Sequence, residues 1–325
     1  YGESRLIKKE HETTSTSCPP HSDLESGNMP PSYGTQPPAP EPVHLHGKKH
    51  EATTDSFKAG NRYTQQHPPQ LKLPSEKVIS GRGGASTYQI VPESSVSERQ
   101  LAIVSEKGRV VQFNKSRGTV VSTMVQANYP MFVPPDAIDK NGDECVEVNT
   151  LTQKPPQAET EEKDPLPILV DDPESNALHY FEITVLSNPK PKDTTIAIGL
   201  ATKPYPPFRL PGWNLHSVGY HSDDGRKFND AYGGRDYGPE WGKVGDTVGC
   251  GYYPNTGFVL FTKNGKNLGT AFTGMRHLWY PTVGAHGPCK VKINFGDDEP
   301  FRYCEARGFG PSGKERSSED TKNVD

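Results

Sequence analysis

The sequence predicts an all-β protein in which two antiparallel sheets pack into a β-sandwich. Two observations lead to this prediction. Short runs of β-branched and aromatic residues recur between residues 101 and 295, with Gly, Pro, Asn and Asp residues between them. No apolar pattern with the period of a helix extends beyond a turn or two. Many short strands joined by such turns are typical of sandwiches and barrels.

Each expected strand is a run of mainly Val, Ile, Leu, Thr, Tyr or Phe that is bounded by turn residues. In chain order, the strands are expected at residues 101–104, 110–113, 119–125, 178–185, 194–201, 217–220, 247–253, 258–263, 282–284 and 289–295. Asn264-Gly265 gives the clearest turn signal, because a type I′ hairpin turn needs φ > 0 at both central residues. We therefore expect a three-stranded meander from residue 247 through this turn into a strand that follows Gly265.

The composition changes along the chain and predicts one folded domain. Residues 1–99 are rich in Ser, Thr, His, Pro and Gln and contain few large apolar residues, so we expect a disordered leader. The folded domain is expected at residues 100–303. Within it, residues 133–176 are acidic and Pro-rich and lack strand periodicity, which indicates a long insertion. Residues 304–325 are polar and are expected to form a disordered tail.

Charge, cysteine content and hydropathy exclude several classes of protein. The net charge of the chain is -4, and no stripe of Lys and Arg alternates with aromatic residues, so the sequence does not predict nucleic-acid binding. The five cysteines are odd in number and show no CxxC spacing, which favours a reducing compartment over a disulfide framework. No apolar run approaches the ~18 residues of a membrane-spanning helix.

Three patterns that suggest catalysis or metal binding lack essential features. A calcium loop centred on Gly142 would need a carboxylate at position 148, which is Val148. The three histidines of residues 44–50 lie in the leader without further ligands. The acidic residues of 159–164 lie in a Pro-rich insertion, where nothing holds a pair of carboxylates rigidly across a cleft. The sequence therefore predicts no metal site, no cofactor and no enzymatic activity.

Two segments in the second half of the chain carry a resemblance to a known family. The segment FTKNGKNLGTAF (residues 261–272), followed by LWYPTVGAHGPCKVKINFG (residues 278–296), resembles the closing half of a SPRY domain. Tyr180-Phe181-Glu182-Ile183 and Ile198-Gly199-Leu200 are similar to earlier strands of that domain. The resemblance covers residues 100–303 and implies a concanavalin A-like jelly roll that binds other proteins through its loops.

Within this family, two subgroups share features with the chain. The run 220–225 (YHSDDG) with Tyr237-Gly238-Pro239 is similar to Ran-binding-protein-type SPRY scaffolds. Lys203–Trp213, together with residues 284–289 (GAHGPC), looks more like fungal endosomal and vacuolar SPRY adaptors. Those adaptors are membrane proteins that recruit a WW-domain HECT ubiquitin ligase to cargo. This resemblance implies a membrane anchor upstream of Tyr1, and a location on the cytoplasmic face of the endosome or vacuole, or in the cytoplasm if no span precedes Tyr1.

A Pro-Pro-x-Tyr motif at Pro30, Pro31 and Tyr33 is the candidate ligand for a WW domain. Consecutive prolines favour the polyproline II conformation, which docks into an aromatic groove at low entropy cost. Further prolines follow at residues 37–42, so a chance match in a Pro-rich segment is the alternative. In the fungal adaptors such motifs usually follow the SPRY domain, whereas here the motif precedes it.

The candidate partner-binding residues lie in the expected loops. Lys203–Trp213 contains four prolines, aromatic residues and an arginine, a combination that suits a binding hot spot. We expect Phe208, Leu210 and Trp213 to point inward and Tyr205 and Arg209 to point outward. The full candidate set consists of aromatic, proline, arginine and aspartate residues of these loops: Tyr205, Pro206, Phe208, Arg209, Trp213, Tyr220, Asp223, Asp224, Tyr237 and Trp241.

The function expected from the sequence is that of a non-enzymatic adaptor. Its SPRY loops would bind a protein cargo, and its Pro-Pro-x-Tyr motif would recruit a WW-domain HECT ubiquitin ligase for endosomal or vacuolar sorting. Two alternatives remain open at this point: a Ran-binding-protein-like scaffold of a multisubunit ubiquitin ligase, and a carbohydrate-binding, lectin-like domain. Binding to a glycan array would favour the last of these.

Overall fold

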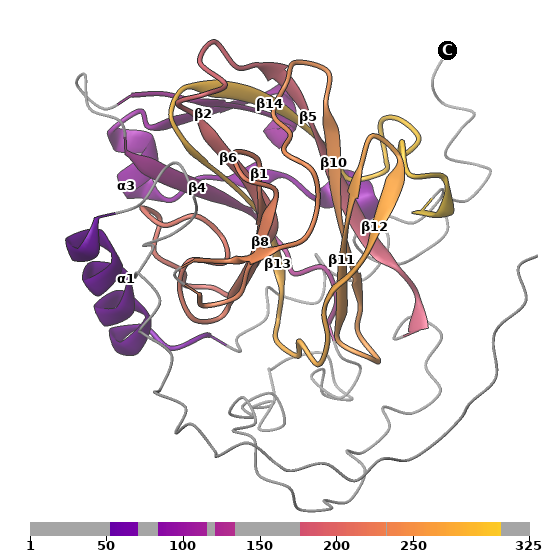
Figure 1. Cartoon of the computed structure of the whole chain (residues 1–325), viewed down its shortest axis with the longest axis horizontal. Helices are drawn as coiled ribbons and strands as arrows, with labels where there is room; N and C mark the ends of the chain where they lie inside the picture. The colour runs from indigo at the N-terminus through magenta and orange to yellow at the C-terminus, as the bar shows by residue number, and fades with distance from the viewer. Residues whose placement is uncertain (1–52, 71–83, 116–120, 134–175, 232, 307–325) are drawn as a thin grey trace, which may run out of the picture. The chain divides into compact units, whose positions relative to one another are not determined.

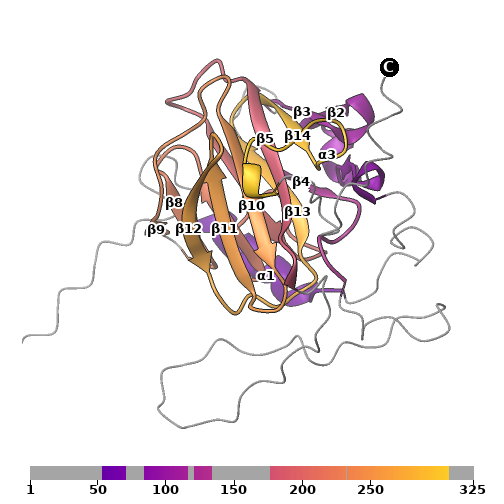
Figure 2. The ribbon, with the colours of Figure 1, turned by 90° about the vertical axis from the view of Figure 1, so that its right-hand side faces the viewer.

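The computed structural model describes residues 53–70, 84–115, 121–133, 176–231 and 233–306. Their strands form two seven-stranded antiparallel sheets, which Figures 1 and 2 show as two layers. The first sheet has the order β1 (Ile90–Val91), β4 (Ser122–Ala127), β13 (Tyr280–His286), β6 (Thr195–Ala201), β7 (Ser217–His221), β8 (Arg226–Phe228), β9 (Arg235–Asp236). The second has the order β12 (Lys266–Phe272), β11 (Phe258–Lys263), β10 (Thr247–Tyr253), β5 (His179–Ser187), β14 (Cys289–Asn294), β3 (Val110–Phe113), β2 (Ala102–Ser105). The predicted antiparallel β-sandwich is confirmed.

The main core lies between the two sheets, and strand periodicity places its residues there. Ile196, Ile198 and Leu200 alternate along β6 and are completely buried in the same apolar cluster as Phe181 and Ile183 of β5. Because successive side chains of a strand point to opposite faces, the residues between them face the outside of the sandwich. The outward-facing residues of β6, such as Ala197 and Ala201, are also completely buried. A further layer therefore covers this outer face.

The predicted hairpin at Asn264-Gly265 is confirmed. Asn264 has φ 51° and Gly265 has φ 81°, and the flanking residues Lys263 and Lys266 pair directly across β11 and β12. β10, β11 and β12 are neighbours in the second sheet, as expected for a meander. The turn residues therefore set the register of this edge of the sandwich.

Replacing Gly265 with valine is expected to lower the free energy of unfolding by about 1–3 kcal/mol. A β-branched residue is strained at this positive φ, and a Cβ atom built on Gly265 would lie 2.6 Å from the carbonyl oxygen of Arg302. Lys266→Val, at the next and exposed position, is the matched control and is expected to change stability by less than ~0.5 kcal/mol. Equal urea denaturation midpoints for the two variants would contradict the strain at this turn.

The boundary predicted at residue 100 is wrong, because ordered elements begin upstream of it. α1 (Thr54–Gln66) and α3 (Ser94–Glu98) are helices, and Ile90 and Val91 pair with β4 as the edge strand of the first sheet. The sequence analysis missed α1 because Phe57 and Tyr63 are its only large apolar residues, too few to give a clear apolar stripe in the sequence. The short strands β8 and β9 were also not predicted.

The domain also includes residues at the other end of the chain. η4 (Cys304–Ala306), a short 3₁₀ helix, lies beyond the predicted end at residue 303. Leu178 and Tyr180 form an apolar cluster with Phe301, Tyr303 and Ala306 on the outer face of the second sheet. The backbone N–H of Arg302 donates to the carboxylate of Glu182 at 3.0 Å, and burial raises the pKa of that carboxyl. These contacts hold the end of the domain on β5.

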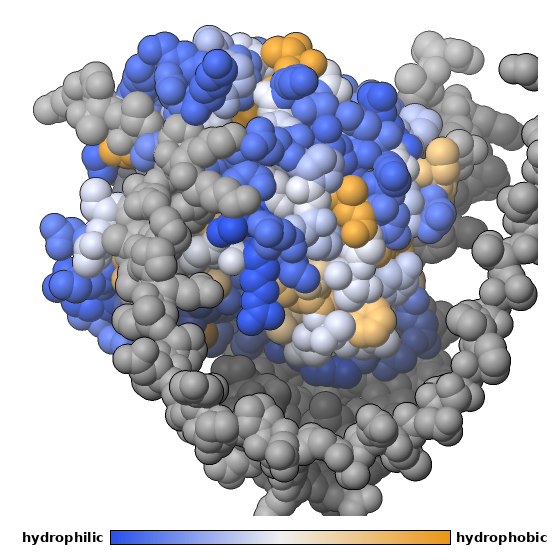
Figure 3. Space-filling model, viewed as in Figure 1, coloured by the Kyte–Doolittle hydropathy of each residue, from blue (hydrophilic) through white to orange (hydrophobic). Residues whose placement is uncertain are grey.

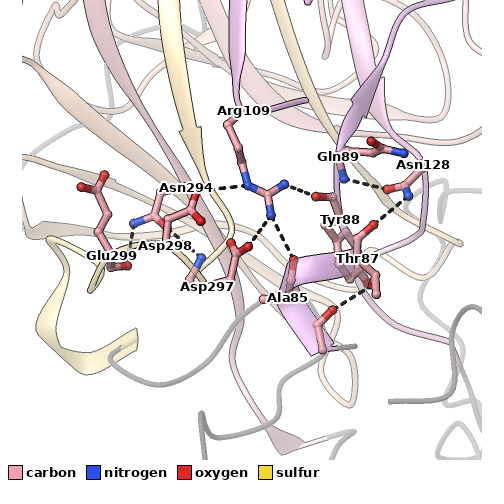
Figure 4. Close-up of polar contacts among 12 residues, drawn as sticks. Ala85, Thr87, Tyr88, Gln89, Arg109, Asn128, Asn294, Asp297, Asp298 and Glu299 are labelled. Carbon is pink, nitrogen blue, oxygen red and sulfur yellow. Dashed lines mark hydrogen bonds and ion pairs between the residues drawn. The ribbon is translucent and has the colours of Figure 1, made fainter. Parts of the chain in front are cut away.

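Arg109 links the N-terminal and C-terminal segments of the domain (Figure 4). Its guanidinium lies 2.5 Å from Asp297 and donates to the backbone carbonyls of Tyr88 and Ala85. The guanidinium also lies 4.8 Å from the centre of the Phe295 ring. A buried arginine is stable only when its donors are satisfied, and here acceptors from both ends of the domain supply them. Residues 84–89 thus belong to the fold, although they precede residue 100.

Candidate partner-binding surface

The outer face of the first sheet is covered by residues 203–216, which we call the outer loop. Leu210 and Trp213 pack with Ala197 of β6 and Phe228 of β8, and Tyr205 packs with Ala201 and Met124 in a second small cluster. The small outward-facing alanines of β6 leave room for these larger side chains. The outer loop is therefore the layer that buries the outer face of β6, whose inner face is buried in the main core.

Tyr205 is a structural residue of this loop and not an exposed contact. Its side chain is completely buried, its hydroxyl donates to the carbonyl of Leu210 at 2.8 Å, and it accepts from the backbone N–H of Asn214 at 3.2 Å. Burial raises the pKa of Tyr205 to about 12. The expectation that Tyr205 points outward is therefore wrong: its hydroxyl joins the two ends of the loop.

Arg209 is also completely buried, which corrects the second outward expectation. Its Nε donates to Oδ1 of Asn214 at 2.7 Å, and its guanidinium lies 4.6 Å from the centre of the Trp213 ring. On its other side, Nη1 donates to the hydroxyl of Ser56 in α1 at 3.0 Å. Arg209 is thus enclosed between the outer loop and a helix that the sequence analysis did not predict.

The expected orientation of Phe208 is wrong in the opposite sense. It was expected to point inward, but its side chain is 37% exposed, whereas Leu210, Trp213 and also Pro206 are buried. The backbone N–H of Arg209 donates to the carbonyl of Pro206 at 3.0 Å, which closes a tight turn that presents Phe208 outward. Tyr63 of α1 meets the Phe208 ring edge to face, with the ring centres 6.3 Å apart. A local turn, which hydropathy does not encode, decides this orientation.

The candidate residues of β7 and beyond lie on the other side of the first sheet. Tyr220 is completely buried in the main core, with its ring centre 5.5 Å from that of Tyr237 and 5.9 Å from that of Trp241. Burial raises the pKa of Tyr237 to about 12. The neighbouring His221 points the opposite way and packs against Trp213, at 5.6 Å between ring centres. The structure therefore does not bring the ten candidate residues into one site.

The β7–β8 turn holds the two aspartates of the candidate set. Oδ1 of Asp224 accepts from the backbone N–H of Arg226 at 3.0 Å, and Asp223 is only 8% exposed. The side chain of Arg226 forms an ion pair with Asp236 of β9 at 3.0 Å. Asp224 thus shapes the turn, and the ion pair between Arg226 and Asp236 joins β8 to β9. Both interactions stabilise the hairpin.

A cavity of about 520 Å³ lies beside the outer loop, next to the end of α1. It is lined by Val91, Glu93, Gln126 and Lys203, among others, and by Gln70, which follows α1. Nζ of Lys203 donates to the carbonyl of Ala127 at 2.7 Å, and burial lowers the pKa of this lysine to about 8. Lys203 is therefore bonded to the end of β4, and the cavity is a partly apolar hollow beside the outer loop.

A family model described as SPRY domain matches residues 178–298, which include β5–β14. Residues 178–298 form a SPRY domain. The resemblance predicted from the sequence is confirmed for this region, and a SPRY domain is a protein-interaction fold. The outer loop and the β7–β8 turn both lie within it.

The relatives are fungal SPRY proteins. The protein named Protein ssh4 of Sclerotinia sclerotiorum is 46% identical over 135 residues, 41% of this chain and 25% of that protein. A SPRY domain-containing protein of Schizosaccharomyces pombe is 46% identical over 121 residues, 37% of this chain and 31% of that protein. The match thus spans only about a quarter to a third of these relatives. A crystal structure of a human SPRY domain is 24% identical, with a TM-score of 0.40, and covers 60% of this chain and 94% of that chain.

Other expectations concern residues that the structure does not describe. The Pro30-Pro31-Ser32-Tyr33 motif, the histidines of 44–50 and the acidic run of 159–164 all lie outside the described residues. Within the described part of the chain, no three His, Cys, Asp or Glu side chains are grouped as a metal site would require. Among the described helices, none combines the length and the apolar character needed to cross a bilayer.

The sequence analysis did not identify α1 or Asn214 as parts of the candidate surface. Nδ2 of Asn214 donates to Oδ1 of Asn61 at 2.7 Å, so α1 binds directly to the outer loop. A weak signal for α1 was present in the sequence. Residues 53–66 contain no proline although prolines are frequent on both sides, and Thr53 is a good N-cap residue. Its hydroxyl does accept from the backbone N–H of Ser56 at 3.2 Å.

Proposed function

We propose that this protein is a non-enzymatic adaptor for ubiquitin-dependent sorting at the endosome or vacuole. Its SPRY domain would bind a protein cargo, and Pro30, Pro31 and Tyr33 would recruit a WW-domain HECT ubiquitin ligase. The observation that carries the proposal is the combination, in one chain, of a SPRY domain similar to fungal SPRY proteins with a Pro-Pro-x-Tyr motif.

The exposed side chains decide which part of the domain is available to cargo. Tyr205 and Trp213 are buried, so they support the surface rather than form it, and Arg209 is buried against α1. Phe208 is 37% exposed and Leu215 is 42% exposed, and both belong to the outer loop. Exposed apolar side chains on a loop held by a rigid scaffold favour protein recognition. We therefore assign the cargo-binding surface to the outer loop around Phe208 and Leu215.

The two modules would act together through effective concentration. A single short polyproline motif binds weakly, but its attachment to a domain that holds cargo makes the encounter between ligase and cargo intramolecular. Nineteen residues lie between Tyr33 and Thr53, the first residue that the structure describes, so a ligase bound at the motif stays tethered to the domain. No catalytic group is required in this scheme.

Tyr33→Ala is expected to weaken binding to isolated WW domains by about 30-fold, equivalent to ~2 kcal/mol. The tyrosine ring supplies the apolar area that fills the pocket next to the proline groove. A pull-down of the full chain by immobilised WW domains of a HECT ligase measures this loss.

Ser32→Ala is the matched control, since the motif accepts different residues at this position, and it is expected to retain wild-type binding. The melting temperature of both variants should equal that of the wild type. If Tyr33→Ala and the wild type bind WW domains equally, the motif is a chance match and ligase recruitment fails.

A further inference from the structure

α1 contacts the outer loop through hydrogen bonds and through the edge-to-face contact between Tyr63 and Phe208. Ser56 accepts from Arg209 at 3.0 Å, and Asn61 accepts from Asn214 at 2.7 Å. Figure 1 places α1 at the periphery of the domain, and Figure 3 shows that the same part of the surface is mostly hydrophilic. Ser56 lies on the same side of the helix as Gly60, about one turn before it, and Asn61 is the next residue, rotated by about 100° around the helix axis.

Gly60 is the point of closest approach between α1 and the loop. A Cβ atom built on Gly60 would lie 2.6 Å from Oδ1 and 2.7 Å from Nδ2 of Asn214. Only a residue without a side chain allows the helix to approach this closely, and this approach brings Asn61 within hydrogen-bond distance of Asn214. Glycine in a helix interior costs about 1 kcal/mol relative to alanine, so this position favours docking over helix stability.

α1 does not belong to the hydrophobic core. Among the apolar clusters formed by the described residues, none contains a residue of α1. An isolated helix of 13 residues is marginal in water. The helix is therefore held mainly by its contacts with the outer loop, in the manner of a bound ligand rather than of a core element.

We propose that the outer loop is a helix-binding surface and that α1 is its resting, intramolecular ligand. A partner binds there by presenting a short polar helix with the same pattern: a hydroxyl residue, glycine four positions later, and a carboxamide residue immediately after it. Such a helix displaces α1 and takes over its contacts with Arg209 and Asn214. This inference rests on the proposed role of the outer loop in cargo recognition and adds the kind of partner and its competition with α1.

The competition has a direct consequence for affinity. α1 is attached to the domain, so its effective concentration lowers the apparent affinity of any helix added in trans. A substitution that removes α1 from the loop without damaging the loop should raise that affinity. Gly60→Leu is suited to this purpose, because leucine increases helix propensity while its side chain clashes with Asn214. Loss of docking in this variant cannot then be assigned to melting of the helix.

The test uses a fluorescein-labelled peptide of residues 53–67 and the full-length chain in fluorescence anisotropy. The peptide is expected to bind Gly60→Leu at least 10-fold more tightly than wild type. Arg62→Leu, which adds the same side chain on the exposed face of α1, should behave as wild type. Asn61→Leu removes the acceptor of Asn214 and should also increase peptide binding. Circular dichroism and the melting temperature establish that each variant is folded.

Specificity is checked from both sides of the interface. A peptide that itself carries Gly60→Leu should not bind, and adding Asn214→Ala to the Gly60→Leu chain should abolish binding of the wild-type peptide. Equal peptide binding by wild type, Gly60→Leu and Asn61→Leu, or no binding by any of them, would overturn the inference and make α1 a fixed part of the domain. WW-domain binding through Tyr33 should be identical in all these variants, so failure here is distinguishable from failure of the adaptor function.

Discussion

Replacing Arg109 with methionine is expected to lower the free energy of unfolding by about 3–5 kcal/mol. The side chains of Arg109 and Asp297 are only 8% and 16% exposed, and the ion pair between them is 2.5 Å long. Oδ1 of Asp297 is buried without a hydrogen-bond partner among the described residues. Removal of the guanidinium would therefore leave a buried carboxylate uncompensated and the carbonyl of Tyr88 without its donor. Urea denaturation followed by tryptophan fluorescence measures the loss.

Two further variants separate the buried charge from the loss of packing. Arg99→Met makes the same change at an exposed position and should alter stability by less than ~0.5 kcal/mol. The double variant Arg109→Met/Asp297→Asn removes the uncompensated charge, and it should be more stable than Arg109→Met alone by about 1 kcal/mol or more. If the double variant is less stable than Arg109→Met, the burial of Asp297 is not the main source of the loss.

Trp213→Ala is expected to lower the free energy of unfolding by a similar amount, about 3–5 kcal/mol. The indole is 1% exposed and packs with Leu210 and Phe228 against the outer face of β6. Its removal leaves a cavity and takes away the ring over which the guanidinium of Arg209 lies. Burial also lowers the pKa of the adjacent His221 to about 4, so water entering this cavity should raise that pKa toward 6.5.

Phe208→Ala is the matched control from the same loop, because Phe208 is 37% exposed and packs against Tyr63 rather than against the sheet. Its expected cost is below ~1 kcal/mol, and the pKa of His221, followed by NMR, should not change. Comparable stability losses in the two variants would mean that the outer loop does not act as the covering layer of β6. The pair thus distinguishes residues that support the outer loop from residues that are exposed on it.

The sequence by itself determined the fold class, most strands and one turn. The alternation of Ile196, Ile198 and Leu200 specifies a strand with one apolar face. The period of two comes from the backbone geometry of a single strand, so it does not depend on the tertiary structure. Asn264-Gly265 likewise determined its hairpin locally, since few other residues adopt φ > 0 at both positions. Residues whose structure depends on their immediate neighbours were therefore predictable.

Only the tertiary structure decided which candidate residues are exposed. Tyr205 and Arg209 are polar and were expected to be at the surface, but Leu210, Asn214 and α1 supply their hydrogen-bond partners and so allow complete burial. Phe208 is apolar and was expected inside, but a turn directs it to solvent. Hydropathy predicts burial well only when a side chain has no specific hydrogen-bond partner. For Arg209, a partner distant in sequence makes burial of a polar side chain possible.

The separation of the candidate residues and the presence of α1 have the same physical origin. Tyr220 and His221 are adjacent in sequence, yet the strand sends one into the core and the other towards Trp213. α1 has too little apolar surface to be recognised from its own residues, and it is stabilised by Arg209 and Asn214, about 150 residues later in the chain. The sequence thus specified a β-sandwich with a SPRY domain. Long-range contacts decided which surface it offers, because the energy of those contacts belongs to pairs of segments and not to either segment alone.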